Sequence, residues 1–531
     1  MQRNLSVLTA AAVIGSAFAP FHTAQAVQVH PPQTQTQTQA DTPAKPHPES
    51  SGPTLEMTRL FLQMSKYAKA DDTVGVVATL KEITAHPDFA GLFVDIRRDL
   101  YIQLAAYQYD LAAYTDAKAS LDKAGALKGT PMTAGYWMMR SGLAMLTDNQ
   151  AEAVESYTQL ARQFPDAVLK SNPSLVFGLI YTSRSLNDKT AHKSLLEALH
   201  TIPIISRGHD SAEDLWFELL EIYVSDGQTD KAKAIANAFT TPQHLIMLRV
   251  DKRYQSLRTV IAADIETALE HELDEDRATI KANPRNLGDI LRLVNALMEQ
   301  NRTAAALAIL DTELTKIEAA PKDKPPFDDL KDSYDWALDT RAQLLRQLGR
   351  YDDAEKAFIK ASQFAKENGT DSIGSMINLS GFYLSQSRPA EALKVVSRTD
   401  TKSAHIYGKM ASEAMFICAS AQLGETDKIK APLNRMLEPE NVSAAYLPAS
   451  VALVCAQDAD RLAELIISHI KDPKTRNATL MSLQGYQDAP ASTTYDLALN
   501  GYYKRVVQRD DVQAAVKTYG EIIAVPIQRM K

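Results

Sequence analysis

A short pattern of residues recurs along this chain and constrains its fold more than any other feature. An aromatic or large apolar residue is followed by a turn marked by Gly, Asn or Asp, then by an alanine about five residues later, and then by an aromatic or leucine about four residues beyond. The clearest copies are Trp137, Ala153, Tyr157 and Pro165; Trp216, Leu219, Tyr223, Gly227 and Ala232; and Gly349, Tyr351, Ala354, Phe358 and Ala361. A period of about 37 residues is typical of stacked helical hairpins, because a single hairpin cannot bury its apolar face without neighbours. The sequence therefore predicts a helical solenoid.

The alanines of the better copies set the register of this array. They are Ala117, Ala153, Ala232, Ala306, Ala354 and Ala392. Where two of them lie about two periods apart, we expect one degenerate hairpin between them, around residues 178–198 and around residues 257–261. Between Ala306 and Ala354 there is one repeat and an insertion, residues 321–327, whose three prolines cannot continue a helix. The insertion is either a loop between consecutive hairpins or a hinge between two shorter solenoids.

These copies resemble the tetratricopeptide repeat (TPR), in which Trp, Leu-Gly and Tyr are followed by Ala, Phe and a closing Pro. Trp216, Leu219 and Tyr223 match the first half of that pattern with Leu220 in place of the glycine, and residues 349–361 and 148–165 match the second half. The resemblance covers most of residues 54–437 and implies an all-α, right-handed solenoid of TPR-like hairpins. The period of about 36–38 residues exceeds the usual 34 of the family. Longer turns between hairpins explain the excess, and related repeats such as HEAT stay open locally.

The N-terminal segments have a different composition. Residues 1–26 have the pattern of an export signal: Arg3, then an uncharged apolar or small-residue run, then Ala24 and Ala26 around a cleavage point after Ala26. Cleavage after Ala19 is the alternative. Residues 27–53, rich in Gln, Thr and Pro, are expected to be a disordered linker. The array then divides into residues 54–320, the insertion 321–327, a second TPR array over 328–440, and degenerate capping repeats over 441–531.

Charge and hydropathy narrow the class of partner. The formal net charge is -8, which gives no basic surface for phosphates, so nucleic acid is not an expected partner. After the signal, no window is apolar enough for a membrane span. We expect an exported protein, periplasmic or, alternatively, secreted.

The family resemblance implies that the first helix of each hairpin lines a concave face that binds proteins or peptides. On the copies that match best, the first-helix residues not used for packing are Met138, Met145, Phe217, Glu221, Trp336, Asp339, Gln343 and Arg346. The alternative is that Met138, Met145 and Phe217 pack between hairpins while Asp339 and Arg346 are solvated. A groove with mixed apolar and polar contacts suits extended or helical protein segments.

No catalytic, cofactor-binding or metal-binding motif stands out. The nearest is His271-Glu272-Leu273-Asp274-Glu275, which has a carboxylate where a zinc-protease helix needs its second histidine, so a solvated acidic helix face is the simpler interpretation. Cys418 and Cys455 suit matching positions in adjacent hairpins. A disulfide needs Cα atoms within about 7 Å, whereas packed helix axes lie about 8–10 Å apart. A bridge at a close crossing and two buried thiols therefore both stay open.

The sequence thus predicts an exported scaffold that binds a protein or peptide partner, in a bacterial-type cell envelope, without a cofactor and without enzymatic activity of its own. Two other hypotheses remain: a diverged envelope enzyme or enzyme subunit acting on peptidoglycan or glycans, and a binder of small ligands or glycan strands.

Overall fold

The computed structural model describes residues 54–129, 131–203, 212–321, 323–368, 372–398 and 404–528. The predicted export signal and linker, residues 1–53, lie outside this described part. Two compact units divide the chain, Met1–Ile222 and Tyr223–Lys531. Both are built of antiparallel helical hairpins, and in the described residues strands are limited to β1 (Gly485–Gln487) and β2 (Ala524–Gln528). The prediction of an all-α solenoid of hairpins is therefore confirmed.

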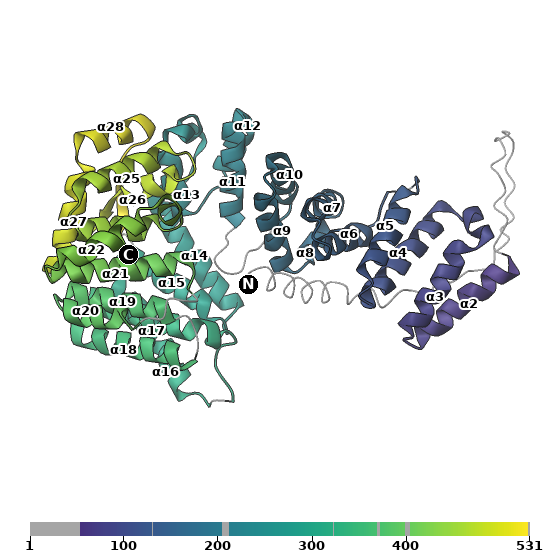
Figure 1. Ribbon diagram of the computed structural model, residues 1–531, viewed down its shortest axis with the longest axis horizontal. Coiled ribbons are helices and arrows are strands. Elements are labelled where there is room, and N and C mark those ends of the chain that lie inside the picture. Colours follow the sequence, from purple (N-terminus) through teal and green to yellow (C-terminus); the bar gives the residue numbers. More distant parts are fainter. Residues whose placement is uncertain are drawn as a thin grey trace. The chain divides into compact units, whose positions relative to one another are not determined.

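In its described residues, unit 1 (residues up to Ile222) contains four hairpins and most of the first helix of a fifth (Figure 1). The hairpins are α2 (Leu55–Lys69) with α3 (Thr73–Ala85), α4 (Val94–Asp110) with α5 (Tyr114–Ala126), α6 (Ala134–Leu146) with α7 (Gln150–Gln163), and α9 (Pro173–Ser185) with α10 (Lys189–His200). Short helices η2 (Pro87–Gly91) and α8 (Pro165–Leu169) connect consecutive hairpins, and α11 (Ala212–Ser225) crosses the unit boundary.

Unit 2 (residues from Tyr223) begins at the end of α11 and continues with α12 (Thr229–Ala236), α13 (Pro242–Val250), η3 (Lys252–Val260) and α14 (Ile265–Ala282). Its regular hairpins are α15 (Leu287–Glu299) with α16 (Thr303–Ala319), α17 (Leu330–Gln347) with α18 (Tyr351–Asn368), α19 (Ser372–Ser385) with α20 (Pro389–Val396), α21 (Ile406–Gln422) with α22 (Thr426–Met436), and α24 (Tyr446–Cys455) with α25 (Ala459–Lys471). The remaining helices are α23 (Pro439–Ala444), α26 (Arg476–Ser482), α27 (Thr494–Val507) and α28 (Asp510–Tyr519).

Two local features repeat from hairpin to hairpin. Each turn between the two helices of a hairpin contains one residue in the left-handed region, for example Asp148, Gly349 and Gly424, which ends the first helix and reverses the chain. The key alanines, from Ala117 to Ala392, are all fully buried, because only a small side chain fits where the two helices cross closely. The turn marker and the alanine that recur in the sequence are thus the two structural requirements of one hairpin.

The proline-rich insertion lies between α16 and α17. Those helices pack against each other, and Phe327 is buried in the core that they share. Arg285 holds the segment through the Asp328 carboxylate and the Pro325 carbonyl, which it meets at 3.2 Å. This arrangement favours a loop between consecutive hairpins over a hinge, and the boundary between the units falls elsewhere, at Ile222/Tyr223.

The end of the chain departs from sequential stacking. α24 and α25 still form a hairpin, but from α26 onward the chain returns to the beginning of unit 2: α26 packs on α13, and β2 packs on α15. Valines and isoleucines of α27, α28 and β2 are buried in the same core as Ile246 and Val250 of α13. The expectation that residues 441–531 simply cap the open end of the array is therefore wrong, because their apolar side chains cover the first helices of the same unit.

Candidate protein-binding surface

The first helices of the hairpins in unit 2 share one face, which we call the inner face of unit 2. It is the side of α15, α17, α19, α21 and α24 on which α27 lies. α27 packs against α19 and α24, and β2 packs against α15. Counted back from the key alanine of each repeat, Met138 and Phe217 stand at the position of Asp339, and Met145 stands at the position of Arg346. The candidate residues therefore mark the same face of successive repeats.

The candidates on α17 differ from one another in their surroundings. Trp336 is 50% exposed, whereas Asp339 is 2% exposed. The Asp339 carboxylate accepts hydrogen bonds from Gln343 Nε2 at 2.9 Å and from Asn378 Nδ2 of α19 at 2.7 Å. Arg346 donates to Asp496 of α27 at 2.9 Å. Asp339 is thus buried and Arg346 is only partly exposed, and part of the predicted groove is occupied by the chain itself.

The segment from β1 to β2 covers the end of the inner face at which Arg346 lies. Tyr351 Oη donates to the Ala491 carbonyl at 2.8 Å, just before α27 begins. Tyr495 of α27 packs against the core formed by α15 to α21. At the far end of the segment, Gln528 of β2 donates to Gln347 Oε1 at 3.0 Å. One helix and one extended stretch of the chain therefore lie on a face made by helices about 150 residues earlier.

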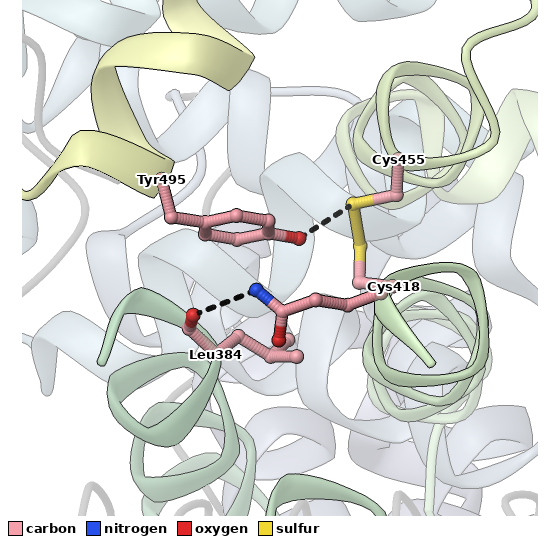
Figure 2. The surroundings of a disulfide bond; sticks show 5 residues. Leu384, Cys418, Cys455 and Tyr495 are labelled. Atoms are coloured by element: carbon pink, nitrogen blue, oxygen red, sulfur yellow. Dashed lines mark hydrogen bonds between the residues drawn. A yellow bond between two sulfur atoms is a disulfide. The ribbon is translucent and has the colours of Figure 1, made fainter. Parts of the chain in front are cut away.

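A disulfide joins two helices of this face. Cys418 of α21 and Cys455 of α24 are bonded, with Cα atoms 4.9 Å apart. Figure 2 shows the Tyr495 ring beside the bridge, with its hydroxyl 3.9 Å from Cys455 Sγ. The two helices approach this closely because small buried residues, among them Ala414 and Ala452, line them. Of the two outcomes left open by the sequence, the structure contains the bridge.

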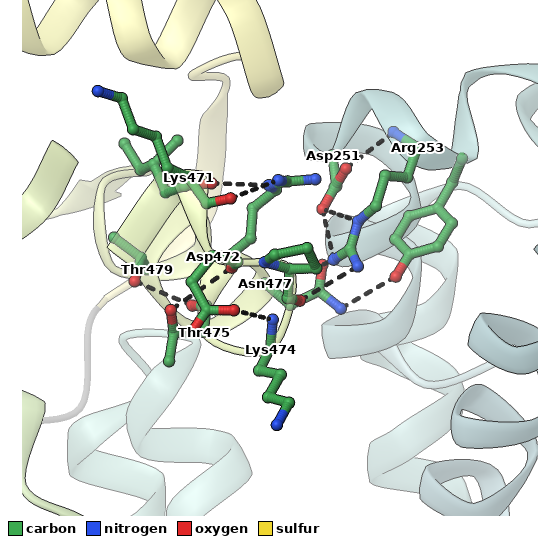
Figure 3. A network of polar contacts seen from close by, with 12 residues as sticks. Asp251, Arg253, Lys471, Asp472, Lys474, Thr475, Asn477 and Thr479 are labelled. Atoms are coloured by element: carbon green, nitrogen blue, oxygen red, sulfur yellow. Dashed lines mark hydrogen bonds and ion pairs between the residues drawn. The ribbon is translucent and has the colours of Figure 1, made fainter. Parts of the chain in front are cut away.

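A polar network joins the beginning and the end of unit 2 (Figure 3). Asp251, which is fully buried, accepts from Arg253 Nε at 2.9 Å. Arg253 also donates to Asn477 Oδ1 of α26 at 2.9 Å, and Asn477 donates to Tyr254 Oη at 3.0 Å. The backbone of Asp251 pairs with Gly520 in an antiparallel bridge. Unit 2 is therefore closed by hydrogen bonds between residues more than 200 positions apart.

The candidate groove residues of unit 1 are more buried than expected for residues that line an open groove. Met138 and Met145 are half-buried and pack against the core of α4 to α6, and Phe217 is buried. Glu221 is partly exposed. The alternative interpretation, in which the two methionines and Phe217 pack between hairpins, therefore agrees better with their burial. Only part of each methionine side chain is exposed and available to a partner.

Three polar side chains in unit 1 contact one another in series and have the composition of a catalytic triad. Ser183 Oγ lies 2.7 Å from His192 Nδ1, and His192 Nε2 lies 3.0 Å from Glu218 Oε1. Ser183 is 1% exposed, and its hydroxyl donates to the Ile180 carbonyl of its own helix at 2.7 Å. A nucleophile must reach its substrate, which the buried Ser183 hydroxyl does not. We therefore interpret these three side chains as a structural connection between α9, α10 and α11.

The acidic helix α14 is less solvated than its sequence suggests. His271 does pair with Glu275 at the surface, at 3.3 Å. Burial, together with the charge of Glu299, raises the pKa of Glu272 to about 7, and burial alone raises the pKa of Glu299 of α15 to about 7. Burial also raises the pKa of Asp276 to about 6, although Arg292 opposes the shift. The prediction of a uniformly solvated acidic face is wrong at Glu272 and Asp276.

Cavities, clusters of metal ligands and membrane-spanning helices are the remaining features that would indicate a functional site. Cavities of about 500 Å³ beside Arg249 and Asp264 and of about 470 Å³ beside Arg461 and His469 lie in unit 2. In the part of the chain that the structure describes, no three His, Cys, Asp or Glu side chains are grouped to hold a metal ion. Across those same residues, no helix has both the length and the hydropathy that crossing a bilayer requires.

Comparisons with known proteins add little to this geometry. No family model matches the chain, and no curated protein matches it. Among solved structures, it is similar to a structure of Naa15/Naa10 bound to HypK-THB, with 11% identity and a TM-score of 0.23 over 87% of this chain and 80% of that one. It is also similar to the crystal structure of yeast Tom70, with 13% identity and a TM-score of 0.25 over 87% of this chain and 99% of that one. Scores this low carry no argument. The hairpins themselves define the class, an all-α helical-repeat protein.

Proposed function

We propose that this chain is an exported scaffold that binds segments of other proteins on the first-helix faces of its hairpins, without catalysis of its own. The observation that supports this proposal is the inner face of unit 2, which holds a helix and an extended stretch of the chain's own C-terminal region. A face built in this way combines apolar packing with side-chain hydrogen bonds, as helix-in-groove recognition does. The corresponding face of unit 1 is built from the same repeat.

Export is supported by two observations from different parts of the chain. Disulfides persist in oxidising compartments and are rare in the cytosol, and Cys418 is bonded to Cys455. Residues 1–26 have the composition of an export signal. We therefore place the mature chain in the periplasm of a bacterial-type envelope, with secretion as the alternative.

Site-specific photo-crosslinking in the intact chain tests the proposal. A photoreactive residue is placed at Met138 or Met145 on the first-helix face of unit 1, and at the exposed Glu155 of α7 as the matched control on the second helix. Crosslinks to one protein species from both methionine positions and none from Glu155 are expected. Equal labelling from Glu155, or no adduct from either methionine position, contradicts segment binding on this face.

A further inference from the structure

The inner face of unit 2 contains a buried acid whose charge is only partly compensated. Gln343 and Asn378 both donate to the Oδ2 atom of Asp339. Its other oxygen, Oδ1, is buried and has no hydrogen-bond partner among the described residues. Buried carboxylates are normally paired with a cation or fully hydrogen-bonded, because an uncompensated buried charge is costly. Asp339 therefore has one carboxylate oxygen that accepts no hydrogen bond.

No basic side chain of the two adjacent helices neutralises Asp339. On α17, Arg341 pairs with Asp311 at 2.6 Å and Arg346 pairs with Asp496 at 2.9 Å. The third basic residue of this helix, Lys331, is exposed in its first turn, about two turns from Asp339. α19 contains no lysine or arginine between Ser372 and Ser385. Burial raises the pKa of Asp339 to about 6, and the charge of Asp335 adds to the rise. At neutral pH the carboxylate is still mostly ionised, so its charge has no cationic partner among the described residues of α17 and α19.

The surroundings of Asp339 also provide an approach for a long side chain. Trp336, one turn before Asp339 on α17, is half exposed. Across from it, α19 has Gly374, where a Cβ atom would lie 3.3 Å from Trp336 Cη2, so the absence of a side chain lets one edge of the indole pack against α19. Gln343 and Asn378 are partly exposed and lie over the acid. Flexible amides in this position are groups that an incoming donor can displace.

We propose that Trp336 and Asp339 form a subsite for a lysine or arginine side chain of a bound protein segment, with Asn378 as the amide that this side chain displaces. The aliphatic part of that side chain lies against the Trp336 ring, and its charged head displaces the Asn378 amide and donates to Asp339, whose Oδ1 atom has no donor in the free chain. Cations are attracted to the face of an indole, and a charge-assisted hydrogen bond to a buried carboxylate is stronger than a neutral one. This inference rests on the proposed function, and it names the chemistry of the partner at one end of the face, opposite the end covered by α27.

Fluorine NMR of the intact chain labelled with 5-fluorotryptophan tests the subsite. The chain has three tryptophans, so the Trp336 resonance is assigned from a Trp336→Phe variant. The probes are n-butylammonium and N-propylguanidinium, which mimic the two basic side chains, with n-pentanol as the neutral control. We expect the cations, and not the alcohol, to shift the Trp336 resonance in a saturable way. In Asp339→Asn, which keeps the shape of the side chain, binding is expected to weaken at least about tenfold. In Asp353→Asn, which alters a partly exposed acid of α18 that pairs with Arg350, binding is expected to stay unchanged.

The NMR and crosslinking results together test the subsite and the binding of protein segments separately. No saturable shift with either cation, or an equal shift in Asp339→Asn, overturns the subsite, whatever the crosslinking from Met138 shows. A cation-specific shift without any protein crosslink retains the subsite and overturns segment binding in favour of small basic ligands. Asn378→Ala, which removes one amide and keeps the acid, is expected to retain cation binding and serves as the second variant should Asp339→Asn not fold.

Discussion

Glu299→Gln is expected to stabilise this protein above neutral pH. Glu299 lies at the end of α15, where burial raises its pKa from 4.5 to about 7, and Glu272 of α14 lies near enough for the Glu299 charge to raise its pKa as well. A neutral amide of the same shape removes one of these two charges. The substitution therefore relieves an electrostatic cost that the native fold bears whenever both acids are ionised.

The sign and size of the effect follow from the raised pKa of Glu299. Between pH 4.5 and about 7 the folded chain binds protons that the unfolded chain has released, so the free energy of unfolding falls as pH rises through this window. The cost is absent below the window and complete above it. A shift of about 2.5 pH units corresponds to roughly 3 kcal/mol, and the coupling to Glu272 spreads that value over the pair.

Urea unfolding followed by circular dichroism at pH 5 and pH 8 measures this effect. At pH 8 we expect Glu299→Gln to raise the free energy of unfolding by about 1–3 kcal/mol, and at pH 5 by much less. Glu367→Gln, which changes an exposed acid of α18, is the matched control and is expected to be neutral at both pH values. A gain of equal size at both pH values, or a loss at pH 8, would refute the reasoning.

Two further predictions concern the disulfide and a close backbone contact. Alkylation of the unfolded, unreduced chain is expected to label no free thiol. The double variant Cys418→Ser, Cys455→Ser is expected to lower the free energy of unfolding by about 4 kcal/mol, because the bridge closes a loop over a separation of 37 residues. A labelled thiol, or an unchanged free energy of unfolding, contradicts the presence of the bridge. Gly520→Ala places a Cβ atom 2.6 Å from the Val250 carbonyl oxygen, so urea unfolding is expected to show a loss of about 1–3 kcal/mol. In the control Gly178→Ala, the new Cβ atom meets nothing within 4 Å and lies in a helix, so the free energy of unfolding is expected to rise by up to about 1 kcal/mol. An unchanged free energy of unfolding in Gly520→Ala would show that Gly520 and Val250 are not in contact.

The repeated part of the fold was predictable because its causes are local. A left-handed residue in each turn and a fully buried alanine where the helices cross, as at Gly349 and Ala354, are required within every hairpin, so both recur in the sequence. The number of classes of structure compatible with such a pattern is small. The same pattern gives several of the candidate residues equivalent positions in their repeats.

The closure of unit 2 was not predictable in the same way. Asp251 and Asn477, or Arg346 and Asp496, meet only because the curvature of many stacked hairpins brings distant segments together. Neither residue of such a pair carries a mark of its partner in the sequence. The burial of Asp339 likewise depends on Asn378 of the next hairpin, so a position predicted to line the groove or, in the alternative, to be solvated is enclosed.

Occupation of the inner face of unit 2 by the chain's own C-terminal segment is the central claim, and one crosslink tests it directly. A photoreactive p-benzoylphenylalanine replaces Tyr351, whose hydroxyl meets the Ala491 carbonyl at 2.8 Å, and the product of irradiation is mapped by mass spectrometry. An intramolecular crosslink to residues 489–493 is predicted at all protein concentrations. Crosslinking only to solvent, to another segment or to a second molecule would show that this face is not filled by the chain itself.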